Sequence, residues 1–354
     1  MPTRRRRPEA PSLPDPPAAR KSGRLGLYLP FAIALLVVIG WSAWWIYARG
    51  EVRARMDVAV EALRRAGYEL TWQERGIGGY PLRMNINLTE MRLREPSGWT
   101  IEAPRLEAQT YMHALGQWVL AAPDGAAFTR PVGGQVRVEG KLIRASLNRM
   151  DQAPPRISFE GTGLTFYPAA GAAPFGLASA DRVEFHLREG PDDQGGLFAR
   201  VDGGRGRPGG LFDRLAGDKP VAMEFNATLS KMSAFAGADW AEAVRAWTGA
   251  GGRMSLRRAA INAGDASLAS SSGSLGVGSD GRLLGTMDVS LRQGPKVFAT
   301  LGDMGLITPQ QAGVAALVVI ARQGAGDTAQ STLHFQAGQT TLGPVAIGPA
   351  PRVY

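Results

Sequence analysis

The sequence contains no cysteine and only three histidines among its 354 residues. A chain without cysteine forms no disulfide bond, has no thiolate nucleophile and binds neither zinc nor an iron–sulfur cluster through sulfur. The histidines (His113, His186 and His334) are far apart in the sequence, and none belongs to an H-E-x-x-H motif. The sequence therefore predicts no catalytic residues, no metal site and no cofactor.

Two further enzyme signatures are absent or misplaced. The nucleophile elbow G-x-S-x-G does not occur. The dinucleotide pattern G-x-G-x-x-G matches residues 204–209 and 276–281, but the first match lies in an expected loop and the second spans an expected hairpin turn. Neither match joins a strand to a long helix, as binding of a pyrophosphate requires. We therefore expect a protein that is not an enzyme.

The positive charge is concentrated at one end of the chain. The formal net charge is +9, and residues 1–24 contain seven Lys and Arg residues against Glu9 and Asp15, a net charge of +5. No basic run with interleaved aromatic residues follows downstream, so the charge does not indicate a nucleic-acid partner.

Residues 25–47 contain no charged side chain. As a helix they would span about 34 Å, enough for the roughly 30 Å of a bilayer core. The basic residues that precede the run are Arg4, Arg5, Arg6, Arg7, Arg20, Lys21 and Arg24, and the aromatic residues at its far end are Trp41, Trp44, Trp45 and Tyr47. A basic cytoplasmic flank and an aromatic interface belt are typical of a membrane-spanning helix. We expect a single-pass signal anchor that contacts the lipid bilayer through residues 25–47.

A cleaved signal peptide is the alternative interpretation. The apolar region of a signal peptide is usually about 7–15 residues and ends at a small-x-small cleavage site. Here the run is longer, and bulky tryptophans surround Ser42 and Ala43. The retained anchor is therefore favoured.

Five segments follow from these patterns. Residues 1–24, rich in proline and arginine, are expected to be a disordered basic cytoplasmic tail. After the anchor at 25–47, residues 48–67 have apolar side chains at helical spacing and end at Gly67, which predicts a stalk helix. Residues 68–215 and 216–354 are expected to be two β-rich halves, the second with short helices.

Apolar and polar residues alternate in several segments after residue 68. The residues that share the apolar face are Leu82, Met84, Ile86 and Leu88 in one segment and Val221, Met223 and Phe225 in another. A period of two predicts strands with one wet face in an antiparallel sheet. The fold class is therefore mainly β with peripheral helices (α+β), an N-terminal transmembrane helix followed by an elongated antiparallel body.

The two segments also resemble each other. PLRMNINLT, from Pro81, and PVAMEFNAT, from Pro220, share Pro, Met, Asn and Thr at the same offsets. Such an echo is expected of a duplication into two similar halves, and it also arises by chance between two strands of this kind.

A hairpin and two helices have clear local signals. Residues 275–291 form two apolar alternating runs around Asp280-Gly281, a dipeptide that favours a tight turn. Residues 239–247 have the pattern of a helix. Residues 308–322 begin with Thr308, Pro309 and Gln311, a capping box, and their body is apolar on nearly every side. We expect this second helix to be buried in the core.

Six short features of the sequence carry a family resemblance: Gly79-Tyr80-Pro81-Leu82-Arg83, Trp99, Ala103-Pro104, Ala246-Trp247 before Gly251-Gly252, the 275–291 hairpin and Leu342-Gly343-Pro344. In these features the chain resembles a proteobacterial family of inner-membrane-anchored proteins, the domain-of-unknown-function family 2125. The resemblance covers roughly residues 25–350 and implies no particular reaction. The layout is also similar, more distantly, to the AsmA-like proteins of Gram-negative envelopes, and that similarity implies a role with envelope lipids.

Three functional hypotheses remain open. The body binds envelope lipid or hydrophobic cargo, or it is a structural scaffold that binds other envelope proteins without catalysis, or, with least support, it is an enzyme acting on envelope polymers. The first requires an open groove along the apolar face, and the second requires that face to be closed. In each case we expect the anchor in a bacterial inner membrane, the N-terminus in the cytoplasm and the body in the periplasm.

Overall fold

A computed structural model describes residues 25–149, 154–324 and 327–354, and the side chains from residue 28 onward. The chain divides into two compact units, Met1–Tyr47 and Ala48–Tyr354. We call the second unit the body.

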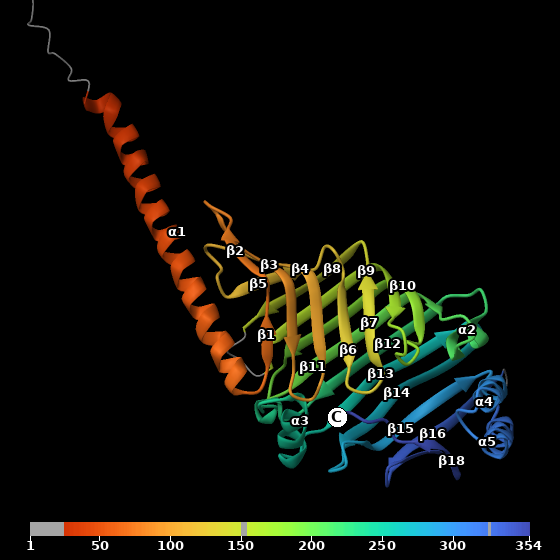
Figure 1. The fold of residues 1–354 in the computed structure, drawn as a ribbon. Helices are drawn as coiled ribbons and strands as arrows, with labels where there is room; N and C mark the ends of the chain where they lie inside the picture. The colour runs from red at the N-terminus through yellow and green to blue at the C-terminus, as the bar shows by residue number, and fades with distance from the viewer. Residues whose placement is uncertain (1–24, 150–153, 325–326) are drawn as a thin grey trace, which may run out of the picture. The chain divides into compact units, whose positions relative to one another are not determined.

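Helix α1 (Leu25–Arg65) runs without interruption through the apolar segment and the predicted stalk (Figure 1). It ends where expected, because Gly67 has a φ of 84° and the amide of Tyr68 donates to the carbonyl of Leu63 (2.9 Å). The helix is long and apolar enough to cross a membrane, a property that a single-pass anchor shares with a signal sequence. The basic residues Arg4, Arg5, Arg6, Arg7, Arg20, Lys21 and Arg24 lie outside the described residues.

The body is built on one antiparallel sheet, which confirms the predicted fold class. Its first strands are β1 (Glu69–Thr71), β2 (Glu74–Gly78), β3 (Arg83–Arg94), β4 (Thr100–Tyr111), β5 (Gln117–Ala121), β6 (Ala126–Arg130), β7 (Gly134–Glu139), β8 (Leu142–Asn148) and β9 (Arg156–Pro168). The later strands are β10 (Leu177–Glu189), β11 (Gly195–Gly206), β12 (Val221–Leu229), β13 (Met254–Ala263), β14 (Ala266–Val277), β15 (Leu283–Arg292), β16 (Thr328–Gln336), β17 (Gln339–Leu342) and β18 (Val345–Pro349).

The predicted division at residue 215 falls between β11 and β12, which are hydrogen-bonded neighbours in this sheet. The two predicted halves therefore share one sheet. Whether they arose by duplication stays a prediction.

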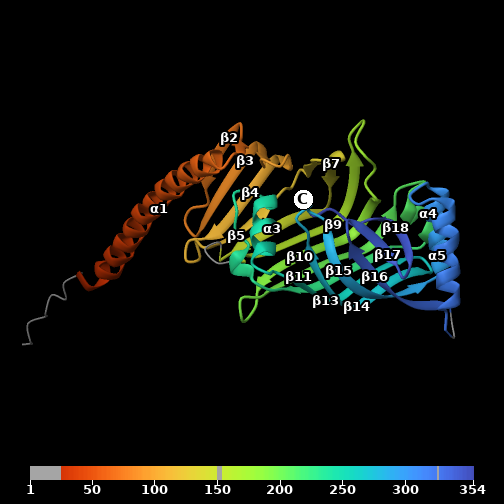
Figure 2. The ribbon, with the colours of Figure 1, turned by 90° about the horizontal axis from the view of Figure 1, so that it is seen from below.

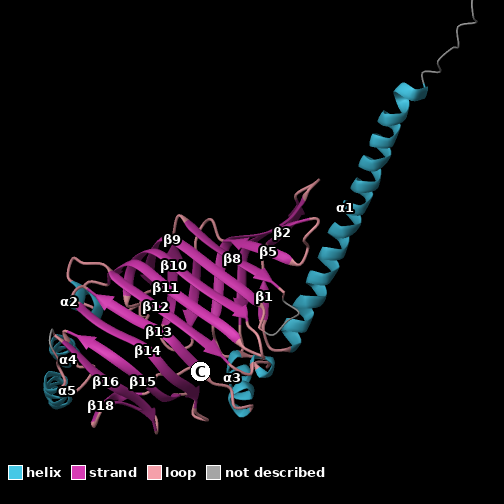
Figure 3. Cartoon of the chain, turned by 180° about the vertical axis from the view of Figure 1, so that it is seen from behind, coloured by secondary structure: helices cyan, strands magenta, loops and turns pink. Residues whose placement is uncertain are grey.

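Short helices lie at both ends of the strands. Helices α2 (Leu211–Ala216), α4 (Gly294–Asp303) and α5 (Pro309–Ala321) lie at one end, and the 3₁₀ turn η1 (Met232–Ala234) precedes α3 (Trp240–Gly249) at the other (Figures 1 and 3). The predicted hairpin is confirmed as β14 and β15, with Gly281 at a φ of 76° in the connecting turn. Helices α3 and α5 confirm the two predicted helices, whereas α4 was not predicted.

The sheet folds back on itself within the body. Figures 1 and 2 show the early strands and β11–β14 in different layers. One core cluster joins the two layers: it contains Val136 from β7 and Phe166 from β9 together with Val221 from β12 and Ala263 from β13. The apolar face of the sheet is consequently its inner face.

Candidate functional site

The strand register lines up apolar residues across the inner face of the sheet. One row runs from β5 to β18 and contains Trp118, Leu147, Ile157, Leu187, Leu197, Ala227, Leu256, Gly273, Met287, Leu333, Leu342 and Val345. A second row runs from β2 to β13 and contains Ile77, Ile86, Ala108, Leu120, Ala145, Phe159, Phe185, Ala199, Phe225 and Ala259. No polar side chain interrupts either row. Residues two apart on a strand point to the same face. On β5 and on β8 to β12, which contribute to both rows, the two residues are two apart, such as Phe185 and Leu187 on β10, so the two rows form one apolar surface.

The middle of this surface is not fully covered. Its side chains are only partly buried on β9, β10, β11 and β12; they are Phe159, Phe185, Leu187, Leu197, Met223 and Phe225. We call this group the apolar trough. Side chains of this size are usually buried completely when they belong to a closed core.

The outer face of the same strands carries charges. Arg144 donates to the Oε2 atom of Glu160 (Nη2 to Oε2, 2.6 Å), and Arg182 donates to its Oε1 atom (2.9 Å). The hydrogen bond from Arg144 is the main reason that the pKa of Glu160 lies below its usual value. Further ion pairs join Arg200 to Asp202 and Arg258 to Glu224. The sheet thus separates a charged outer face from an apolar inner one.

A cavity of about 320 Å³ lies at one end of the trough, under η1 and α3. We call it the α3 cavity. It shares Phe185, Leu187 and Leu197 with the trough, and its other lining residues are Leu229, Met232, Phe235, Trp240, Val244, Trp247, Met254, Leu275, Gly276, Val277, Leu283 and Val353. The lining is apolar throughout.

Hydrogen bonds hold the two tryptophans of α3 against this cavity. The indole nitrogen of Trp247 donates to the carbonyl of Ser230 (2.6 Å), and that of Trp240 donates to the carbonyl of Val353 (2.7 Å). Both indole N–H groups thus have a hydrogen-bond partner, and the ring surfaces remain available to the cavity.

An acidic side chain connects the β3–β4 link to the first turn of α3. The Oε1 atom of Glu95 accepts a hydrogen bond from the amide of Trp240 (2.7 Å). Burial, followed by the charges of Glu95 and Asp239, raises the pKa of the nearby Tyr68 above its usual value. This contact brings the early strands to the helix that covers the α3 cavity.

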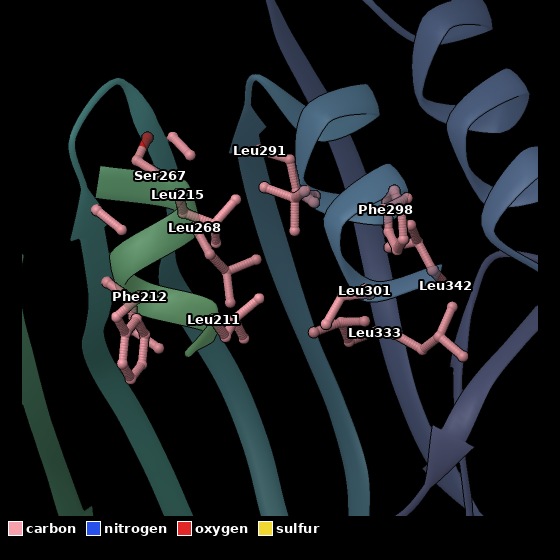
Figure 4. Close-up of a pocket in the computed structure, with 15 residues that line it drawn as sticks. Leu211, Phe212, Leu215, Ser267, Leu268, Leu291, Phe298, Leu301, Leu333 and Leu342 are labelled. Atoms are coloured by element: carbon pink, nitrogen blue, oxygen red, sulfur yellow. The ribbon is translucent and has the colours of Figure 1, made fainter. Parts of the chain in front are cut away.

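A second cavity, of about 220 Å³, lies under α2 and α4 at the opposite end of the strands. We call it the α2–α4 cavity. Figure 4 shows Leu211, Phe212 and Leu215 of α2 on one side and Phe298 and Leu301 of α4 on the other. The sheet contributes mainly Ile261, Ala263, Ala266, Ser267, Leu268, Leu291, Leu333, Leu342 and Ile347.

Strand β13 runs from the α3 cavity to the α2–α4 cavity beside the trough. Met254 in the α3 cavity and Ile261 in the α2–α4 cavity lie on the same strand, seven residue steps or about 23 Å apart. Between them, Met223 and Phe225 of β12 pair with Ile261 and Ala259 of β13. The arrangement offers a long apolar surface with a cavity at each end.

The apolar residues selected from the sequence occupy three different environments. Met84 and Val221 are completely buried, and Ile86 and Leu88 are nearly so. Met223 and Phe225 are partly buried and belong to the trough.

The prediction for Leu82 is wrong. This residue lies in the turn before β3 and is 63% exposed. The turn is set by Gly79, whose φ is 102° and where an added Cβ atom would lie 2.8 Å from the carbonyl oxygen of Arg83.

The prediction that α5 is a buried core helix is also wrong. Its limits and its capping box are as expected, but only Ala312, Ala315 and Val319 are buried. Leu317 is 67% exposed.

The four aromatic residues at the far end of the apolar run also differ in environment. Trp41, Trp44 and Tyr47 are exposed along α1, and Trp45 is buried. Their predicted place at a membrane interface stays a prediction.

The three histidines are not brought together. His113 lies between β4 and β5, His186 on β10 and His334 on β16, and five strands separate the last two in the sheet. Within residues 25–149, 154–324 and 327–354, no group of three or more His, Asp or Glu side chains is placed to hold a metal ion.

The comparisons with known proteins give a family. Residues 45–351 match the family described as "Uncharacterized protein conserved in bacteria (DUF2125)". The chain belongs to the DUF2125 family. No curated protein and no solved structure matches it.

Several lining residues of this DUF2125 protein were not predicted to line a site. Val297, Phe298 and Leu301 come from the unpredicted helix α4, and Trp240 and Trp247 come from α3, which was predicted only as a helix. The amphipathic spacing of WAEAVRAW could have indicated the latter pair.

Proposed function

We propose that this protein binds the acyl chains of envelope lipid in the apolar trough, and that it acts by binding and not by catalysis. The observation that carries the proposal is the pair of unbroken apolar rows whose middle residues, such as Phe185 and Phe225, stay partly exposed. Burial of an acyl chain there would remove apolar surface from water on both sides of the contact, worth about 25 cal/mol per Å².

The length of the site suits one acyl chain. The two cavities are about 23 Å apart along β13. An acyl chain crosses half of a bilayer core that is roughly 30 Å thick. The trough and its end cavities therefore have room for one extended chain.

We also propose that α1 is a retained anchor in a bacterial inner membrane, with the N-terminus in the cytoplasm and the body in the periplasm. The support is the uncharged run of residues 25–47, together with the excess of Lys and Arg in residues 1–24. In this location the body is tethered beside a source of lipid.

The alternative is a structural scaffold that binds other envelope proteins. In a scaffold with a closed core, we expect the phenylalanines on the inner face of the sheet to be fully buried. The exposure of Phe159, Phe185 and Phe225 therefore favours lipid binding over this alternative.

Native mass spectrometry tests the proposal. The body (Ala48–Tyr354) is expressed in a bacterial periplasm and weighed before and after extraction with organic solvent. We expect stoichiometric lipid that extraction removes. A folded body that carries no lipid, and that takes up no palmitate in vitro, would contradict lipid binding and favour the scaffold.

A pair of matched variants assigns the bound lipid to the trough. Phe225→Asp places a charge on the inner face and is expected to abolish lipid retention. Phe198→Asp makes the same change on the outer face, where Phe198 stacks on His186 with ring centroids 5.9 Å apart, and should leave lipid bound. Equal retention by the two variants would place the lipid elsewhere.

A further inference from the structure

Helix α5 presents an uncharged apolar stripe to solvent. Val314, Leu317 and Ile320 are 44%, 67% and 50% exposed. Their spacing of three residues puts them on one side of the helix. The helix contains no charged residue from Pro309 to Ala321. We call these three residues the α5 stripe.

The stripe faces outward because the opposite side of α5 is tightly packed. Added Cβ atoms at Gly294 and Gly302 of α4 would lie 2.5 Å from Val319 and 2.9 Å from Ala312 of α5. Such distances allow no larger side chain, so small residues set the contact between the two helices.

Capping and a side-chain hydrogen bond also fix the rotation of α5. Thr308 and Gln311 form a complete capping box, and the Nε2 atom of Gln311 donates to the carbonyl of Ala346 on β18 (3.0 Å). Turning the stripe inward would break these contacts. Its exposure is therefore a built feature of the body.

The chemistry of the stripe fits lipid better than protein. The cores of protein interfaces are enriched in Trp, Tyr and Arg, which supply directional contacts. The α5 stripe has only aliphatic side chains, which suit the acyl region of a bilayer because that region offers no polar partners. The chain also carries a helix able to cross a membrane.

The position of α5 relates the stripe to the proposed site. Helix α4 packs against α5 through Gly294 and Gly302, and its residues Val297, Phe298 and Leu301 line the α2–α4 cavity. A single helix thus separates the exposed stripe from the cavity. A bilayer in contact with α5 would bring acyl chains next to that end of the trough.

We propose that α5 lies in a membrane interface, with Val314, Leu317 and Ile320 among the lipid acyl chains, and that lipid enters the trough at the α4–α5 end. The membrane contact stands without the proposed function, whereas the entry route rests on it.

The absence of cysteine allows a direct test in the full chain. Leu317→Cys provides a single site for the environment-sensitive dye NBD, and Val132→Cys provides a matched control in the β6–β7 turn, where Val132 is 91% exposed. Each labelled chain is reconstituted in phosphatidylcholine vesicles with and without dibromo-phosphatidylcholine. We expect the brominated lipid to quench the label at position 317 severalfold more than the label at position 132. Equal quenching at the two positions would overturn the membrane contact.

A second measurement separates a bilayer from other occupants. The body without residues 1–47 is floated with phosphatidylcholine vesicles. We expect Leu317→Asp to lose flotation and Val132→Asp to keep it. If the body instead forms dimers that Leu317→Asp dissociates, and does not float, the occupant is a second copy and the proposal is wrong. Lipid retained by Leu317→Asp in native mass spectrometry would overturn the entry route at the α4–α5 end and leave lipid binding in the trough intact.

Discussion

Strands β3 and β12 carry similar sequences and differ in how they are covered. Met84 on β3 and Met223 on β12 occupy the same offset after Pro81 and Pro220. Met84 has no exposed surface, whereas Met223 is partly exposed on the trough. An alternating pattern therefore identifies the apolar face of a strand but does not tell whether another part of the chain covers that face.

Aspartate at each methionine should separate the two environments. Met84→Asp buries an unpaired charge and is expected to lower the free energy of unfolding by about 3–5 kcal/mol. In Met223→Asp the new carboxylate stays in contact with water, so we expect the free energy of unfolding to fall by only about 1–2 kcal/mol. The body should stay folded but no longer bind lipid. Urea unfolding followed by circular dichroism measures both losses. Equal losses would mean that β12 is covered as completely as β3.

The cover of the α3 cavity gives a smaller, pH-dependent effect. Asp193 accepts hydrogen bonds from the amide and the hydroxyl of Ser233 in η1 (2.7 and 2.9 Å). These bonds, the one from the amide first, hold the pKa of Asp193 below its usual value. A carboxyl group whose pKa is lower in the folded than in the unfolded state stabilises the fold at pH values above its unfolded-state pKa. This stability is lost as the pH falls through the folded-state pKa.

We therefore expect Asp193→Asn to lower the melting temperature at neutral pH and to have no effect in acid below the lowered pKa. Asp192→Asn is the matched control, because it makes the same chemical change one residue away from this contact. A difference between wild type and Asp193→Asn that persists unchanged into acid would contradict the role of the carboxylate.

The smallest effect is expected at the residue that the alternating pattern misplaced. Leu82 is 63% exposed in the turn before β3. Leu82→Ala should change the free energy of unfolding by no more than about 0.5 kcal/mol. A decrease in the free energy of unfolding close to that of Met84→Asp, in the same urea titration, would mean that Leu82 is buried on the apolar face after all.

The sequence predicted the features that depend on neighbouring residues. The β14–β15 hairpin follows from Asp280-Gly281, and the start of α5 from Thr308 and Gln311, because turns and caps are made by residues close together in the chain. Helix α4 was missed because Gly294-Pro295 has the composition of a turn, although proline is also favoured in the first turn of a helix.

The candidate site depended on contacts between distant residues. Phe185, Ala199 and Phe225 form one apolar row only through strand register. The closure of α3 over its cavity uses a hydrogen bond between Glu95 and Trp240, 145 residues apart. The exposure of Leu317 is set by the packing of α5 on α4, so hydrophobicity alone led to the wrong expectation of a buried helix.

The order of the strands has a consequence for how the body folds. From β8 to β18, every strand pairs with the next strand in the chain. Contacts between neighbouring segments close short loops and favour fast folding. During synthesis, which proceeds from the N-terminus, the chain can therefore complete this part of the sheet one strand at a time. Each unpaired edge strand then serves as the template for the strand that follows.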